Sequence, residues 1–241
     1  VAYWILVKLT KSELSANYAT SLANTVLSLM IPSNTARGAV MSPICDNICE
    51  DMGYKRGEHK GDSAIMLSNL YTNTTNTWLF YTAVGANAIG MALVEEMTGQ
   101  SISWTGWLKA TCIPAGIIVL LIPLITNFLF GTRKGEKRSI DIEFAKKKLE
   151  EMGPLTVKEK KAAIYFVLTL LAFCTNGIHH VAPDYVVFVT IFLMLCPGIG
   201  VCSFKDVGPN FAWPAFIQLG FAMSLASCVN KTGGFQWLVD A

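Results

Sequence analysis

Charged residues are scarce in this chain, and their scarcity limits the classes of protein to which it can belong. Asp, Glu, Lys and Arg make up 15% of its 241 residues, whereas soluble domains carry about 25%. Hydrophobic residues make up 52%, and the mean hydropathy is +0.44. Residues 107–130 hold a single charge, Lys109, and a bilayer is crossed by about 20 apolar residues. The composition therefore argues against an ordinary soluble protein and predicts a membrane protein.

The sequence also has few residues placed for catalysis or metal binding. It contains three histidines and seven cysteines, and most of the cysteines lie in or beside apolar stretches, where this residue behaves as a small hydrophobe. Cys45, Cys49 and His59 suggest zinc binding, but a fourth ligand at a suitable spacing is missing. No pair of His, Cys or acidic residues is spaced for nucleophilic or general-base work. We therefore expect no enzyme activity, no cofactor and no nucleic-acid partner.

Apolar blocks recur along the chain and predict several membrane crossings. Besides residues 107–130, the candidates are residues 64–94, 162–178, 185–199 and 211–229. Residues 1–10 are expected to be the tail of a truncated transmembrane helix, because no initiator Met precedes them. The chain is thus expected to be a fragment. The predicted fold class is all-α: a polytopic helical membrane protein, in contact with lipid, with a re-entrant hairpin and broken helices.

Lysine and arginine concentrate in residues 131–161, and this predicts the orientation of the chain. Short cytoplasmic loops are enriched in these residues, so this loop and the basic loop at residues 45–62 are placed in the cytoplasm. Residues 63–130 would cross outward as a broken helix and then return. Within the longer loop, Ser139 as an N-cap and Gly153 as an end signal predict a short helix, either along the membrane surface or in a solvated linker.

A polar group interrupts the apolar stretch SLMIPSNTARGAVMSPI at residues 28–44. Its apolar arms, residues 22–30 and 36–44, each supply about half of a crossing. Residues 11–44 are therefore predicted to form a re-entrant hairpin. Irregular backbone at membrane depth is tolerated only where it lines protein or a water-filled cavity, so the tip of this hairpin is expected to line a binding cavity.

The tip residues Ser33, Asn34 and Thr35 have two readings. Their hydroxyl, amide and backbone N–H groups suit a carboxylate, and their oxygens suit a sodium ion. Alternatively, Ser33 or Asn34 is simply the N-cap of a helix that starts at Thr35, a position these residue types favour. The spacing does not separate the two readings.

Two further polar features lie near the hairpin. Residues 72–77 are six consecutive Thr and Asn residues in mid-span, and we expect Thr75, Asn76 and Thr77 to face the hairpin tip and bind substrate. The alternative is that the run holds helices together, as such residues do in membrane bundles. Arg37 is either a charge partner for the substrate or is satisfied by carbonyl groups at a helix break.

The segment IPSNTARGAVMSPI, preceded by LSANYATSLANTVLSL and followed by the Thr/Asn-rich helix, resembles the divalent anion/sodium symporter family. The resemblance is strongest to the citrate and 2-oxoglutarate/malate translocator branch. It implies half of an inverted-repeat elevator transporter, homodimeric when full length, in a bacterial or organelle inner membrane. Residues 162–241 would be the first helices of an incomplete second repeat.

The resemblance also implies a function and a set of site residues. The family transports di- and tricarboxylates such as succinate, malate, 2-oxoglutarate and citrate, by sodium symport or by dicarboxylate exchange. Ser33, Asn34 and Thr35 would bind substrate, and Ser33, Asn34 and the backbone near Ala83 would hold sodium in a coupled member. A second Ser-Asn-Thr motif is missing from the sequence, so the fragment alone would lack the second half of the site. The alternative is a non-transporting membrane protein or a degenerate relative.

Overall fold

The structure is a computed structural model that describes residues 2–54, 57, 60–131, 143–179, 181, 183–205, 207 and 213–232. His59, the predicted N-cap Ser139, and the basic residues Arg133, Lys134, Lys137 and Arg138 of the longer loop lie outside these residues. All regular elements in the described part of the chain are helices, which agrees with the predicted fold class. The chain divides into two compact units, Val1–Val186 and Val187–Ala241, which are described separately.

The predicted hairpin is formed by α2 (Glu13–Met30) and α3 (Asn34–Asp51). α2 begins with a capping box between Ser12 and Ser15 and ends at Ile31, whose backbone is extended. Each arm has 18 residues and is about 27 Å long. The arms are therefore longer than the apolar stretches suggested, and residues 45–51, predicted as loop, are helical. Their buried face, which includes Ile48, continues to pack against the core and keeps the helix intact.

The predicted broken span is α4 (Lys60–Leu79), the 3₁₀ turn η1 (Tyr81–Ala83) and α5 (Gly85–Thr98). The backbone is extended at Phe80 and Val84, on either side of the turn. Asn87 Nδ2 lies within hydrogen-bonding distance of the carbonyl oxygens of Thr77, Phe80 and Tyr81. The break thus leaves carbonyl groups without their intrahelical donors, and the Asn87 side-chain amide donates hydrogen bonds to them.

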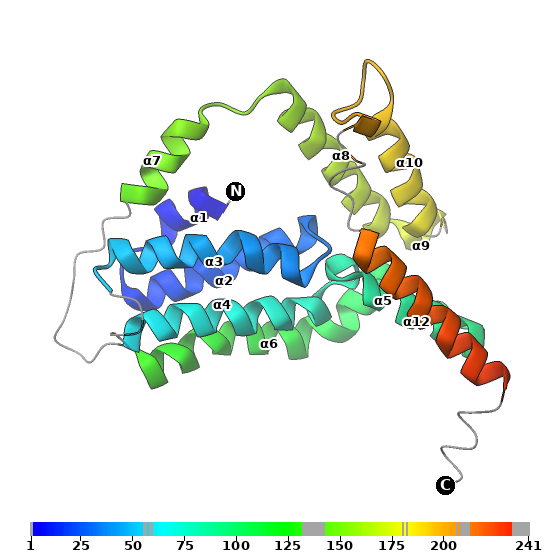
Figure 1. Cartoon of the computed structure of the whole chain (residues 1–241), viewed down its shortest axis with the longest axis horizontal. Coiled ribbons are helices and arrows are strands. Elements are labelled where there is room, and N and C mark those ends of the chain that lie inside the picture. Colours follow the sequence, from blue (N-terminus) through cyan, green and yellow to red (C-terminus); the bar gives the residue numbers. More distant parts are fainter. Residues whose placement is uncertain are drawn as a thin grey trace, which may run out of the picture. The chain divides into compact units, whose positions relative to one another are not determined.

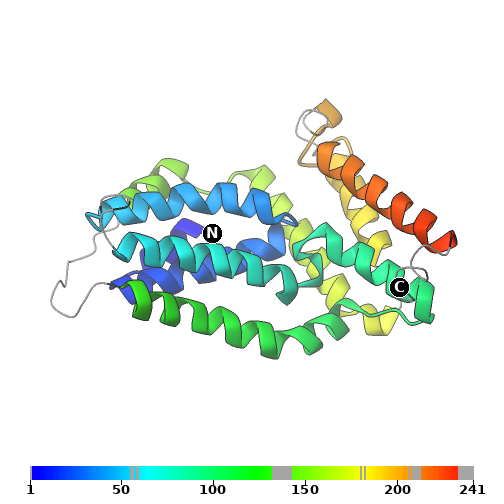
Figure 2. The ribbon, with the colours of Figure 1, turned by 60° about the horizontal axis from the view of Figure 1, so that its bottom comes forward.

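The longest helix is α6 (Trp104–Phe130), with 27 residues. Its most apolar 18 residues have a mean hydropathy of 2.3, and among the described residues it is the one helix long and apolar enough to cross a membrane. Figure 1 and Figure 2 show α2, α3, α4 and α6 running side by side. Trp104 at the start of α6 stacks between Phe80 and Phe173, at ring-centroid distances of 6.5 and 6.3 Å.

The core of the first unit lies where α1 (Ala2–Leu9) packs on the hairpin. Ala16, Ala19 and Ala23 are fully buried on one face of α2, and such small residues let helix backbones approach closely. Two further helices belong to this unit, α8 (Val157–Cys174) and α9 (Asn176–His179). α7 (Glu143–Met152) packs against α1 and α3 and buries Ala145. The short helix expected in the basic loop is therefore present.

The second unit contains most of α10 (Pro183–Leu195) and all of α12 (Trp213–Lys231). These helices, like α8, correspond to predicted crossings. Within the described residues, these helices do not combine the length and the mean hydropathy that a membrane crossing requires, whereas α6 does. Their exposed faces carry large apolar residues, including Phe188, Phe192 and Phe221.

Candidate functional site

The hairpin turns at residues 31–33, and Ser33 caps the second arm. Ser33 has extended backbone (φ −148°, ψ 119°), and its Oγ accepts a hydrogen bond from the Ala36 N–H at 3.2 Å. α3 begins at Asn34, one residue before the start considered from the sequence. The capping reading of Ser33 is confirmed, and its role toward a substrate or sodium stays a prediction.

Asn34 and Thr35 form the open part of the tip. The Asn34 Oδ1 atom is buried and has no hydrogen-bond partner among the described residues, whereas the Thr35 side chain is exposed. The first N–H groups of a helix lack intrahelical acceptors. Ser33 accepts from the N–H groups of Ala36 and Arg37. The N–H groups of Asn34 and Thr35 have no acceptor in the part of the chain that the structure describes.

Arg37 is fully buried one turn into α3 and makes four hydrogen bonds. Its Nη1 donates to the Ile31 carbonyl at 2.8 Å and to the Ala83 carbonyl at 2.7 Å. Its Nε donates to Asn73 Oδ1 at 3.0 Å, and its Nη2 to the Asn73 carbonyl at 3.4 Å. The structure thus satisfies the guanidinium with carbonyl groups at the helix break, the second of the two readings from the sequence.

Asn73 connects Arg37 to the tip. Its Oδ1 accepts from Arg37, and its Nδ2 donates to the Asn34 carbonyl at 3.0 Å. Ala83, predicted to hold sodium through its carbonyl, is buried and gives that carbonyl to Arg37. The hairpin tip, the middle of α4 and the turn η1 therefore meet at one guanidinium group.

A second set of polar side chains, all buried except the half-buried Thr25, joins α2 to α4, and we call it the polar seam. The Ser21 hydroxyl bonds to Ser68 at 3.1 Å and accepts from Thr72 at 3.0 Å. Asn24 donates to Asn69 at 2.8 Å and accepts from Asn76 Nδ2 at 3.3 Å, while Asn76 Oδ1 accepts from Thr25 at 3.2 Å. The members of the seam are Ser21, Asn24, Thr25, Ser68, Asn69, Thr72 and Asn76. Asn76, predicted to face the tip, is used in this seam.

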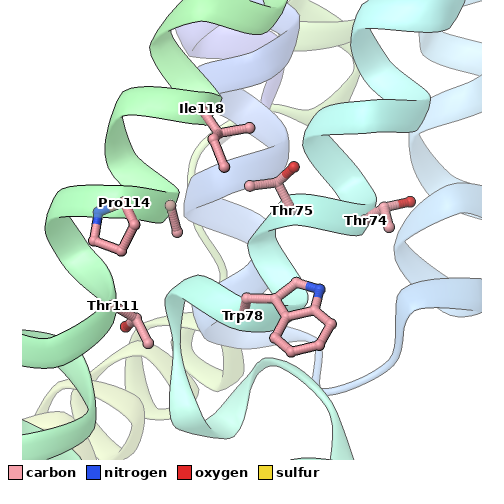
Figure 3. A pocket seen from close by; sticks show the side chains of 7 residues that line it. Thr74, Thr75, Trp78, Thr111, Pro114 and Ile118 are labelled. Atoms are coloured by element: carbon pink, nitrogen blue, oxygen red, sulfur yellow. The ribbon is translucent and has the colours of Figure 1, made fainter.

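The other predicted residues of the Thr/Asn run point elsewhere. The Thr77 hydroxyl donates to the Thr74 carbonyl at 2.6 Å, within the same helix. Thr75 lines a groove of about 370 Å³ between α4 and α6, shown in Figure 3. The other residues that line the groove are Thr74, Trp78, Thr111, Pro114, Ala115 and Ile118. The structure therefore does not bring Thr75 and Thr77 together with Ser33, Asn34 and Thr35 through any contact between the described residues.

The sequence reading gave no role to Asn73 as an individual residue, nor to Asn24 and Asn69, which lie in the same buried interface. A signal for them was present. On α4, residues 69, 73 and 76 are spaced by four and three positions, and on α2 residues 17, 21 and 24 have the same spacing. Positions spaced in this way lie on one helix face. Two such polar stripes on neighbouring helices indicate a shared interface.

A polar hairpin tip fixed to a broken helix beside an apolar spanning helix is typical of membrane proteins that build binding sites from irregular backbone. Comparison of the sequence with models of known protein families identifies the family. The family model for the sodium:sulfate symporter transmembrane region matches residues 1–241, and the chain belongs to this family. It is therefore a membrane protein.

Curated relatives match over nearly the whole chain at low identity. The chain is 27% identical to the chloroplastic dicarboxylate transporter 1 of Spinacia oleracea, over 100% of this chain and 42% of the relative. It is 25% identical to the putative malate transporter YflS of Bacillus subtilis, over 100% of this chain and 51% of the relative. It is 25% identical to an L-tartrate/succinate antiporter of Escherichia coli, over 98% and 49%. The chain spans about half the length of the curated relatives that it matches.

Proposed function

We propose that this chain is part of a secondary transporter that carries dicarboxylates across a membrane. The family membership and the printed names of the relatives support this class of substrate. The observation that carries the proposal is the tip of the hairpin, where the backbone N–H groups of Asn34 and Thr35 have no acceptor among the described residues. Beside them the Asn34 Oδ1 is buried and unpaired. An unpaired buried polar atom is costly and indicates a missing partner. Because Oδ1 is an acceptor, the partner that it lacks is a donor, such as the hydroxyl group of malate, and not a carboxylate oxygen.

The chemistry of the tip fits a carboxylate. N–H groups at a helix start donate to anions, and the helix dipole adds to the attraction. The exposed Thr35 hydroxyl is a further donor. A dicarboxylate has a second charged end, which the 241 residues do not match with a second Ser-Asn-Thr tip. We propose that the complete polypeptide supplies this second half and acts as a multi-pass homodimer, as the family resemblance implies.

The contact between Arg37 and Ala83 favours exchange over sodium symport. A sodium ion at this position would need the Ala83 carbonyl as a ligand, and the guanidinium already donates to it at 2.7 Å. Arg37 cannot lose its charge in a protein. A fixed positive charge at this place makes entry of sodium unfavourable, because like charges repel strongly at low dielectric. We therefore propose dicarboxylate exchange, and sodium symport is the outcome that would contradict it.

The test is uptake of labelled succinate, malate and citrate into proteoliposomes that carry the complete polypeptide. Unlabelled dicarboxylate inside the vesicles is expected to stimulate uptake, and a sodium gradient is expected to have no effect. Asn34→Ala removes the side-chain Nδ2 donor of the tip. It is expected to lower uptake by about tenfold or more, since a hydrogen bond to a charged group contributes about 1.5–3 kcal/mol.

The matched control is Asn47→Ala in the same helix. Among the described residues, the Asn47 side chain is hydrogen-bonded only to the Pro43 carbonyl, more than two helical turns from the tip. This variant is therefore expected to transport normally. If neither gradient moves any of the three substrates, or if Asn34→Ala transports like the unsubstituted protein, the proposed function is wrong.

A further inference from the structure

The hairpin tip, the middle of α4 and the turn η1 are joined by two side chains, Arg37 and Asn73. Arg37 reaches the carbonyl of Ile31, where the first hairpin arm ends, and the carbonyl of Ala83 in the turn η1. Asn73, in the middle of α4, bonds to Arg37 on one side and to the Asn34 carbonyl on the other. Both residues are buried: Arg37 has no exposed surface, and Asn73 is 6% exposed.

The donors and acceptors around Asn73 allow only one orientation of its side-chain amide. Arginine has donors and no acceptor, and a backbone carbonyl only accepts. The side chain between Arg37 and the Asn34 carbonyl must therefore accept on one side and donate on the other. An amide does both, and Arg37 fixes which way the Asn73 amide points. An aspartate in the same place would pair with Arg37 but would turn an acceptor toward the Asn34 carbonyl.

We propose that Arg37 and Asn73 are positioning residues: together they hold the start of α3 so that the N–H groups of Asn34 and Thr35 face the ligand. The inference rests on the proposed function for the identity of that ligand. The full burial of Arg37 separates this role from direct contact with substrate, because the guanidinium has no surface to offer. A binding group that is held in place before the ligand arrives loses less entropy on binding.

Two substitutions separate positioning from charge. Arg37→Lys keeps the positive charge but replaces the planar fork by one ammonium, which cannot reach the Ile31 carbonyl, the Ala83 carbonyl and both Asn73 oxygens as the guanidinium does. Asn73→Asp keeps the partner of Arg37 and removes the donor to Asn34. In exchange assays on the complete polypeptide, both variants are expected to raise KM for dicarboxylate several-fold, with a smaller change in the maximal rate.

The matched control is Asn69→Asp. Asn69 lies one turn before Asn73 on the same face of α4 and is equally buried, but its Oδ1 accepts from Asn24 in the polar seam and makes no contact with the tip. This variant reports the cost of a buried aspartate in this helix. It is expected to leave KM unchanged even where it lowers the amount of folded protein.

A second readout does not depend on transport. A cysteine in place of the half-buried Ile31 is treated with a water-soluble thiol reagent in membranes, against the same background without that cysteine. Labelling is expected to become several-fold faster with Asn73→Asp and to stay the same with Asn69→Asp. Equal rates in both variants, or no change in either, would overturn the positioning role. A failure of transport in the unsubstituted protein would overturn the proposed function and leave the labelling result to decide on its own.

Discussion

Helix α4 has two different faces, and the comparison between them explains how this part of the chain is stabilised. The face toward the hairpin buries polar side chains, among them Asn69, Thr72 and Asn76, and each of these has a side-chain partner on α2. The opposite face carries Leu70, Tyr71 and Trp78, whose side chains are more than half exposed at 56%, 53% and 65%. Polar groups lie where partners exist, and apolar groups lie where they do not.

The difference follows from the surroundings of each face. In hydrocarbon, an apolar side chain gains little by leaving lipid for protein, so helices associate through close packing and interhelical hydrogen bonds. The seam provides such bonds. The hydroxyls of Thr74, which lines the groove, and of Thr77 bond to carbonyl groups of their own helix, so they need no partner on α6. These hydroxyls therefore bear little on how the two helices associate.

The largest contrast is expected between two neighbouring positions, Thr75 and Asn76. Asn76 is fully buried in the seam, and Thr75 lines the groove beside α6. A cysteine at Thr75 is expected to react readily with a small water-soluble thiol reagent in detergent-solubilised protein, and a cysteine at Asn76 is expected to stay almost unlabelled. Equal labelling of the two positions would show that the seam opens, and the distinction between the faces would fail.

A smaller effect is expected on stability. Asn76→Leu removes one donor and one acceptor from the seam. Asn24 Oδ1 then loses its donor, and the Thr25 hydroxyl keeps only its bond to the Ser21 carbonyl. Interhelical hydrogen bonds in membrane proteins contribute about 0.6 kcal/mol each and up to about 1.7. The thermal unfolding midpoint in detergent is expected to fall by an amount that corresponds to about 1–2 kcal/mol.

Thr77→Val is the control for this substitution, because it removes a hydroxyl that bonds only within its own helix. We expect a change of less than about 0.5 kcal/mol. A loss as large as that of Asn76→Leu would mean that the two faces of α4 contribute alike.

The sequence predicts the elements of this region better than it predicts the directions of their side chains. The hairpin with its polar tip and the break between α4 and α5 were both visible, because Pro, Ser and Asn in an apolar stretch are strong local signals. The run at residues 72–77 was expected to face one way. A helix turns by about 100° per residue, so six consecutive residues cannot share a face, and the structure distributes them between the seam, the groove and the helix itself.

The partners of Arg37 could not be predicted from the sequence. The choice between substrate and carbonyl groups depends on where residues 73 and 83 lie in space, and that is set by tertiary packing across a break in the chain. The length of the hairpin arms was underestimated for a related reason. Hydropathy identifies the apolar half of each arm. Packing of α2 against α1 and α4, and of α3 against α4 and α7, keeps the polar halves helical.

The smallest effect is expected from a change of pH, which should alter the local stability of the exposed start of α8 but not that of the polar seam. The seam consists of neutral amides and hydroxyls, so its hydrogen bonds do not titrate. At the start of α8, the Glu159 carboxylate accepts from the Thr156 hydroxyl and N–H, both at 2.7 Å. These two bonds hold the pKa of Glu159 below its usual value of 4.5. A lowered pKa means that the cap stabilises the helix above pH 4.5 and is lost as the pH falls through the shifted value.

Hydrogen exchange, corrected for its intrinsic pH dependence, measures this difference. On acidification, the protection of residues 157–161 is expected to fall, while that of residues 68–76 is expected to stay constant. Glu159→Gln is expected to remove the pH dependence; if it persists in this variant, a different group near α8 is responsible.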